Sequence, residues 1–177
     1  MRPAFKCEPM KILFAFLLGL SLLTLASFET NAQDRKVTIL LVRHAEKVDS
    51  TGNDPELTTQ GKERAERLVK RIGRYRPGAF YSTNYKRTRD TLAPLAAKRK
   101  KEIKIYDPRK PQDLIDEIMK SGTKRFVVAG HSNTIPGLAN LITKKELFKN
   151  LDDAEHSVIW LIRLKDGKVK KLELLEY

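Results

Sequence analysis

The stretch TILLVRHAEK, from Thr38 to Lys47, decides the fold of this chain and introduces its chemistry. Residues 37–42 form a mainly apolar run, which is typical of a strand buried on both faces. Arg43, His44 and Glu46 follow that run directly. Strands buried on both faces occur in parallel sheets covered by helices, where ligands bind beyond the carboxyl ends of the strands. The stretch therefore predicts an α/β sheet with reactive side chains at its ligand-binding edge.

The rest of the chain supports this prediction by alternating strand and helix patterns. In chain order, strands are expected at 79–81, 103–106 and 125–130, and helices at 58–72, 85–98, 111–119 and 134–142. The C-terminal part differs, because two strand-like runs flank Asp166-Gly167, a pair typical of a tight hairpin turn. We therefore expect a three-layer α/β/α sandwich, with a mostly parallel sheet and an antiparallel C-terminal hairpin at its edge.

The N-terminal part has the pattern of a secretory signal. Basic residues precede an uncharged run at 12–28, and a polar segment follows it. Small residues at Thr30-Asn31-Ala32 predict cleavage before Gln33, with Ser27 as a second possible site, so that 1–32 is the signal and 33–177 the domain. An uncleaved membrane anchor is the alternative, since the run is just long enough to span a bilayer. We expect a secreted or periplasmic protein or, failing cleavage, a membrane-anchored one.

The composition indicates the charge of the binding partners but does not identify a particular partner. The chain has 35 basic and 22 acidic residues, and removing the three basic and two acidic residues of 1–32 leaves a net charge of +12. This charge favours acidic partners, such as phosphorylated metabolites, envelope polymers, lipid head groups or nucleic acid. The only cysteine, Cys7, lies in the expected signal, which suits an oxidising compartment.

Two histidines and two arginines are expected at the same edge of the sheet. His44 follows the first strand, His131 follows the strand at 125–130, and Arg87 and Arg89 follow the strand at 79–81. Helical geometry does not choose between these two arginines. A neutral imidazole can attack phosphorus, arginine forks can hold the phosphoryl oxygens, and a second imidazole can donate a proton. The pattern predicts phosphoryl transfer through a phosphohistidine.

A metal site is the competing use of two histidines. The neighbouring arginines would repel a divalent cation and attract an anion, so we expect neither a metal nor another cofactor. The third histidine, His156, has no predicted partner at a strand end and is expected to be an ordinary surface residue.

Four segments in order, LVRHAEK, LTTQG, YSTNYKRTRDT and VVAGHSNTI, resemble the motifs of the histidine phosphatase superfamily, also called phosphoglycerate mutase-like. The resemblance extends over essentially all of 33–177. It implies that His44 is the phosphorylated nucleophile and that Arg43, Arg87 and His131 complete the phosphate pocket. It also implies that Glu46 contributes to substrate binding by supporting the pocket arginines.

The chain departs from the family's pattern in informative places. Ala45 replaces the glycine of the Arg-His-Gly-Glu signature, Asn84 replaces a proline and Asp90 a glutamine. Family members with mutase activity carry a glutamate acid in a long segment after the third strand, where this chain offers only Asp107 as a general acid. The compact layout resembles the phosphohistidine phosphatase-like branch and disfavours a sugar-phosphate mutase. The implied function is metal-independent hydrolysis of a phosphomonoester, on a small molecule or an envelope glycan.

Two non-enzymatic functions stay open. Ala45 would suit a degenerate module that binds phosphate without turnover. The basic segment at 98–104 would suit a domain that binds anionic polymers, although a solvated helix end explains it more simply and no specific nucleic acid is expected. The sequence predicts neither the substrate nor the oligomeric state.

Overall fold

The computed structural model describes residues 34–49 and 52–177, which belong to one folded unit, residues 34–177. The predicted signal at 1–32 lies outside the described residues. In chain order the elements are β1 (Lys36–Arg43), α2 (Thr59–Ile72), a 3₁₀ turn η1 (Gly73–Tyr75), β2 (Ala79–Ser82), α3 (Lys86–Arg99), β3 (Ile103–Ile105), α4 (Pro111–Lys120), β4 (Arg125–Gly130), α5 (Thr134–Thr143), β5 (Val158–Lys165) and β6 (Lys168–Glu176). These ends agree closely with those predicted from the sequence.

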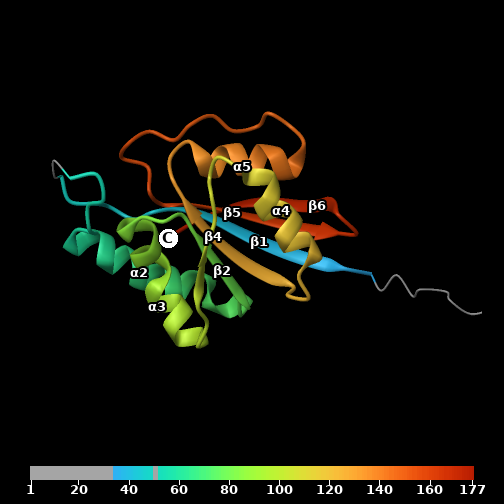
Figure 1. Cartoon of the computed structure of the whole chain (residues 1–177), viewed down its shortest axis with the longest axis horizontal. Coiled ribbons are helices and arrows are strands. Elements are labelled where there is room, and N and C mark those ends of the chain that lie inside the picture. The colour runs from blue at the N-terminus through green and yellow to red at the C-terminus, as the bar shows by residue number, and fades with distance from the viewer. Residues whose placement is uncertain (1–33, 50–51) are drawn as a thin grey trace, which may run out of the picture. The chain divides into compact units, whose positions relative to one another are not determined.

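The strands form one sheet in the order β3-β2-β4-β1-β5-β6. The first four of these run parallel, whereas β5 is antiparallel to β1 and β6 is antiparallel to β5. Figure 1 shows α2 and α3 on one side of the sheet and α4 and α5 on the other. The structure therefore confirms the predicted three-layer sandwich with an antiparallel C-terminal edge.

The side chains of β1 explain why the sheet is covered on both faces. Successive side chains of a strand point to opposite faces. Ile39 and Leu41 pack with buried residues of α4 and α5, whereas Leu40 and Val42 pack with buried residues of α2 and α3. The apolar run thus supplies two separate cores, one on each side of the strand.

The LTTQG segment joins the start of α2 to the chain that follows β1. The Thr58 N–H donates to the carbonyl of Glu46 (2.9 Å), and the Thr58 hydroxyl caps α2 by accepting from the N–H of Gly61 (3.0 Å). A Cβ on Gly61 would meet the Glu46 carbonyl oxygen, so the close approach requires glycine. This contact holds the backbone next to the histidine that follows β1.

Strand direction and register bring distant segments to one edge. Arg43 pairs with Gly130 at the ends of β1 and β4, and Ser82 at the end of β2 pairs with Ala129. Because β5 is antiparallel, it begins at this same edge, where Ile159 pairs with Val42. Among the described residues, no helix is both long and apolar enough to cross a membrane.

Candidate active site

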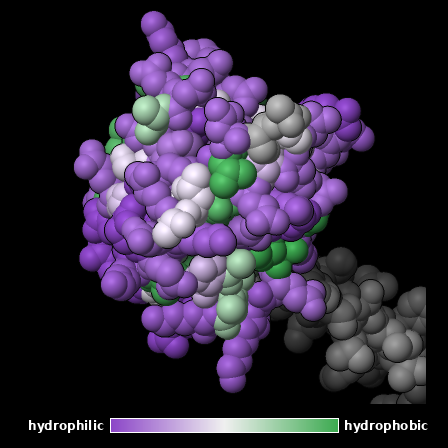
Figure 2. Space-filling model, turned by 90° about the vertical axis from the view of Figure 1, so that its left-hand side faces the viewer, coloured by the Kyte–Doolittle hydropathy of each residue, from purple (hydrophilic) through white to green (hydrophobic). Residues whose placement is uncertain are grey.

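An open pocket with a volume of about 600 Å³ lies at this edge of the sheet. It is lined by Arg43, His44, Lys47, Tyr85, Arg87, Pro108, Arg109, His131, Ser132, Asn133, Thr134 and Asp153. Figure 2 shows the end of the molecule at which β1 ends, and its surface is mainly hydrophilic. The structure therefore brings together four of the residues predicted from the sequence: Arg43, His44, Arg87 and His131.

The tautomer of His44 follows from its backbone neighbour. The ring is buried, with 4% of its surface exposed, and its Nδ1 lies 2.8 Å from the carbonyl oxygen of Ala45. A carbonyl only accepts, so Nδ1 carries the proton and Nε2 of the neutral ring carries the lone pair. Burial, together with the charges of Arg87 and Arg43, lowers the pKa of His44 to about 3 despite that bond. His44 is therefore a neutral imidazole at neutral pH, with Nε2 free to act as a nucleophile.

Arg43 is held by the segment that precedes β5. Its Nη1 donates to the backbone carbonyls of Asp152 (2.6 Å) and Glu155 (2.8 Å), and its Nη2 lies 3.7 Å from the carboxylate of Asp153. These contacts hold the buried guanidinium beside His44. Its remaining N–H groups are available to donate hydrogen bonds to an anion.

The structure distinguishes Arg87 from Arg89, which helical geometry alone did not. Arg87 lies in the first turn of α3 and lines the pocket, with its guanidinium 4.3 Å from the ring centroid of Tyr85. Its Nε is buried and has no partner among the described residues. Arg89 donates to the side chain of Asn84 (2.5 Å) and does not line the pocket. Arg87 is therefore the arginine placed to bind an anion.

His131 faces His44 across the pocket. The two ring centroids lie 5.5 Å apart in an edge-to-face arrangement, and Nε2 of His131 lies 3.0 Å from the hydroxyl of Thr83. Burial, together with the charges of Arg87 and Arg43, lowers the pKa of His131 to about 4. With Nε2 engaged by Thr83, Nδ1 is the ring nitrogen left for a ligand.

Asp107 does not fit its predicted role as the general acid. It lies in the short connection between β3 and α4, where its carboxylate accepts three bonds from Arg109, between 2.9 and 3.1 Å long. These bonds lower the pKa of Asp107, which keeps it ionised and leaves it without a proton to donate. Pro108 and Arg109 line the pocket, whereas Asp107 does not. The carboxylate instead stabilises the turn before α4.

Glu46 also has a different partner from the one expected. Its carboxylate binds Arg64 of α2 through a fork of bonds from Nε (2.8 and 3.0 Å) and Nη2 (2.7 Å), and not through the pocket arginines. Burial alone would raise the pKa of Glu46, but the bonds from Arg64 outweigh it, and the pKa is lowered. Glu46 therefore makes no direct bond to the pocket arginines; its ion pair joins the chain after β1 to α2, and only its charge favours the charged form of Arg43.

The prediction that His156 is an ordinary surface residue is wrong as well. Its side chain is buried, its Nδ1 lies 2.8 Å from the carbonyl oxygen of His44, and the two rings lie 5.6 Å apart. The predicted topology placed an antiparallel hairpin at an edge of the sheet, but it did not place that hairpin next to β1. An antiparallel strand next to β1 must begin where β1 ends, so a residue just before β5 lies beside His44.

Metal ligation is a further possible use of the histidines. In the part of the chain that the structure describes, no group of three histidine, cysteine, aspartate or glutamate side chains is placed to hold a metal ion. The donors beside His44 and His131 are guanidinium groups, which bind anions.

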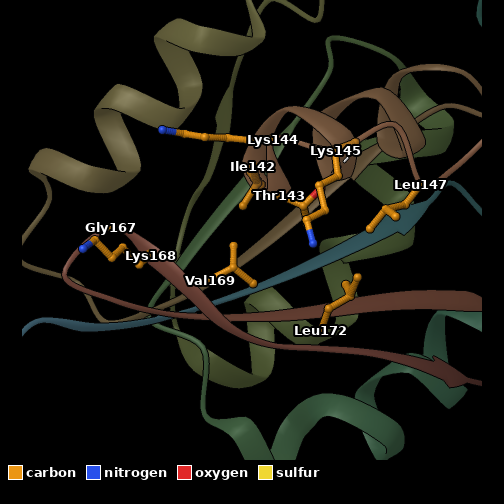
Figure 3. Close-up of a pocket in the computed structure, with 9 residues that line it drawn as sticks. All are labelled: Ile142, Thr143, Lys144, Lys145, Leu147, Gly167, Lys168, Val169 and Leu172. Carbon is orange, nitrogen blue, oxygen red and sulfur yellow. Dashed lines mark hydrogen bonds between the residues drawn. The ribbon is translucent and has the colours of Figure 1, made fainter.

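A second cavity, of about 380 Å³, lies between the end of α5 and the β5–β6 hairpin (Figure 3). Val169 and Leu172 face Ile142 and Thr143 across it, and lysines line its rim. Its lining includes no imidazole, carboxylate or thiol, in contrast to the pocket at the edge at which β1 ends.

Comparison with known proteins agrees with this geometry. Residues 39–109 match the sequence model of the histidine phosphatase superfamily (branch 1). Over this segment the chain is similar to the histidine phosphatases. The matched segment includes Arg43, His44 and Arg87, whereas His131 and His156 lie beyond it. No curated protein matches the chain.

Several solved structures of phosphatases share the fold of this chain. The alpha-ribazole phosphatase of Shigella flexneri is 11% identical over 80% of this chain and 96% of its own, with a TM-score of 0.66. A mycobacterial glucosyl-3-phosphoglycerate phosphatase is 12% identical over 81% and 99%, with a TM-score of 0.63. A candidate phosphohistidine phosphatase, SixA, from Agrobacterium tumefaciens is 18% identical over 80% and 99%, with a TM-score of 0.60. At these identities the likeness shows the fold alone.

Proposed function

We propose that this protein is a phosphatase that hydrolyses a phosphomonoester through a phosphohistidine on Nε2 of His44. The observation that carries the proposal is the bond from Nδ1 of His44 to the carbonyl of Ala45, which leaves the Nε2 lone pair beside Arg43, Arg87 and His131. A nucleophile surrounded by anion-binding donors is the arrangement that phosphoryl transfer requires.

The first step forms the phosphohistidine. Nε2 of His44 attacks phosphorus, the bond from phosphorus to the leaving oxygen breaks, and that oxygen takes a proton from water, while His131 can donate a hydrogen bond to a phosphoryl oxygen. Arg43 and Arg87 neutralise the charge on the remaining phosphoryl oxygens. In the second step water attacks phosphorus and loses a proton, the phosphorus–nitrogen bond breaks, and inorganic phosphate leaves with His44 neutral again.

The proposed substrate is a phosphorylated small molecule or an envelope glycan outside the cytoplasm. The signal-like pattern at 1–32 and the net charge of +12 for 33–177 support this proposal. The connection between β3 and α4 contains only residues 106–110, so it adds no long segment over the pocket. A mutase would need an enclosed site that retains its intermediate.

The test is a rapid quench during turnover of ³²P-labelled phosphomonoesters, followed by analysis of the protein. We expect a label that is stable in alkali and labile in acid, that is lost in His44→Ala and that forms in the presence of a chelator. A label on serine or aspartate would contradict the proposal. Phosphate binding without turnover would indicate the degenerate module, and salt-sensitive polymer binding that survives His44→Ala would indicate the basic adhesive domain.

Arg87 and Arg89 provide a matched pair for the same assay. Arg87→Ala should lower kcat/KM by about a hundredfold or more, since it removes a guanidinium from the pocket. Arg89→Ala removes the same group from the same helix outside the pocket and should have little effect. Equal losses in the two variants would show that general positive charge, rather than a placed guanidinium, supports turnover.

A further inference from the structure

A third histidine supports the backbone of the proposed nucleophile from outside the pocket. His156 donates from Nδ1 to the carbonyl of His44 at 2.8 Å, because a carbonyl can only accept. His156 is 8% exposed and does not line the pocket of about 600 Å³; it lines a smaller pocket, of about 330 Å³, that shares Arg43 and His44 with the larger one.

With the bond from His156, both ends of the peptide group between His44 and Ala45 are hydrogen-bonded. The carbonyl of His44 and the N–H of Ala45 belong to the same peptide. His156 binds the carbonyl end, while the N–H end donates to the hydroxyl of Thr91 in α3 at 2.8 Å. The orientation of this peptide sets where the Ala45 carbonyl lies, and that carbonyl accepts the Nδ1 proton of His44. His156 therefore helps to hold the Ala45 carbonyl in the position where it accepts the Nδ1 proton of His44, which leaves Nε2 unprotonated.

The same short segment also holds the neighbouring arginine. Asp152 and Glu155, just before His156, supply the carbonyls that bind Nη1 of Arg43. Residues 152–156, which we call the supporting segment, thus fix both the guanidinium and the backbone of the nucleophile. Each of these contacts joins residues more than a hundred positions apart in the chain.

We propose that His156 is a positioning residue, whose Nδ1–H bond to the His44 carbonyl holds the Nε2 lone pair of His44 in line for attack on phosphorus. This inference rests on the proposed function. A small displacement of a reacting group can cost about a hundredfold in rate, so loss of the bond should affect the chemical step more than binding.

The test compares three substitutions in the full chain, with p-nitrophenyl phosphate as substrate. Asparagine places its amide nitrogen where Nδ1 of His156 lies, glutamine places its nitrogen near Nε2, and leucine has no donor. We expect His156→Leu and His156→Gln to lower kcat by about tenfold or more with KM changed less than about threefold. His156→Asn should restore kcat to within about threefold of the wild type.

A purely structural role would give a different result. It would lower the melting temperature of the variants without changing kcat per folded molecule, or make His156→Asn as slow as His156→Leu, and either outcome would overturn the inference. If His156→Leu does not fold, the comparison of His156→Gln with His156→Asn decides the same question.

A second readout does not depend on turnover. ¹⁵N NMR of the His44 imidazole should show protonated Nδ1 in the wild type and in His156→Asn, and a mixture of tautomers in His156→Gln. Unchanged ¹⁵N shifts in His156→Gln would overturn the inference. A wild type without turnover or phosphohistidine would overturn the proposed function instead, and the NMR comparison would still decide whether His156 positions His44.

Discussion

At the scale of single residues, the state of each imidazole depends on the group that meets its ring nitrogen. His44 and His156 each meet a backbone carbonyl, which forces Nδ1 to carry the proton. His131 meets a hydroxyl, which can donate or accept, so its tautomer can change during a reaction cycle. The residue with the fixed tautomer is the better nucleophile, and the residue with the adaptable tautomer can donate a hydrogen bond to a phosphoryl oxygen or accept one.

The two pocket histidines should titrate far below an ordinary histidine. Burial beside arginines lowers the pKa of His44 to about 3 and that of His131 to about 4. NMR titration of the free protein should therefore show both rings neutral above about pH 5. Midpoints near 6.5 for both rings would contradict the burial argument.

The same shifts predict how stability depends on pH. Because the folded pKa values lie below the unfolded value of about 6.5, the unfolded chain takes up these protons first as the pH falls. The contribution of the neutral imidazoles is present above about pH 6.5 and is lost toward about pH 3. Urea unfolding should give a lower midpoint at pH 4.5 than at pH 7, and a smaller difference in His44→Gln, in which one of the two groups is absent.

Asp107 provides a residue-scale test of the proton source. A general acid contributes about a hundredfold or more, and mainly for poor leaving groups. Since Asp107 is ionised and bound to Arg109, Asp107→Asn should lower kcat by similar small factors for alkyl phosphates and for p-nitrophenyl phosphate. A much larger loss on alkyl phosphates would restore Asp107 as the acid.

At the scale of secondary-structure elements, the chain after β1 is held on two sides. The start of α2 binds Glu46 through Thr58 and through the ion pair to Arg64, and the supporting segment binds Arg43 and His44. A buried or half-buried fork such as that of Arg64 and Glu46 positions groups more reliably than an exposed pair does. The site therefore depends on the packing of α2 and on the start of β5, although neither supplies a group that lines the larger pocket.

Two glycines test the contact at the start of α2. Gly61→Ala should lower the free energy of unfolding by about 1–3 kcal/mol, because its Cβ would meet the Glu46 carbonyl oxygen, and it should lower activity by displacing the chain beside His44. Gly137→Ala, in the open interior of α5, should instead raise the free energy of unfolding by about 0.4–1 kcal/mol. Denaturation with urea measures both, and destabilisation of equal size in the two variants would refute the steric explanation.

At the scale of the whole molecule, the positive net charge and the signal-like pattern at 1–32 both fit the proposed anionic substrate outside the cytoplasm. A net charge of +12 on 33–177 gives a strongly basic surface, which raises the local concentration of anionic substrates and makes their association sensitive to salt. An exported phosphatase would meet phosphorylated envelope components before cytoplasmic ones.

We predict that the N-terminal segment is removed from the protein. Mass spectrometry of the protein from its native host should find a chain that begins at or near Gln33, since small residues precede this position after an apolar run. A mass that includes residues 1–32, with the protein in the membrane fraction, would favour the anchor.

Local patterns of apolar residues and turn residues were enough to predict the strands and helices in their order along the chain. The sequence also placed Arg43, His44, Arg87 and His131 at one edge, since the carboxyl ends of parallel strands meet there. The ion pair of Glu46 with Arg64 and the contact of His156 with the His44 carbonyl could be seen only in the folded chain. The physical reason is that these contacts depend on how α2 and β5 pack against β1, over 18 and 112 positions of chain, and no short-range pattern encodes the register of that packing.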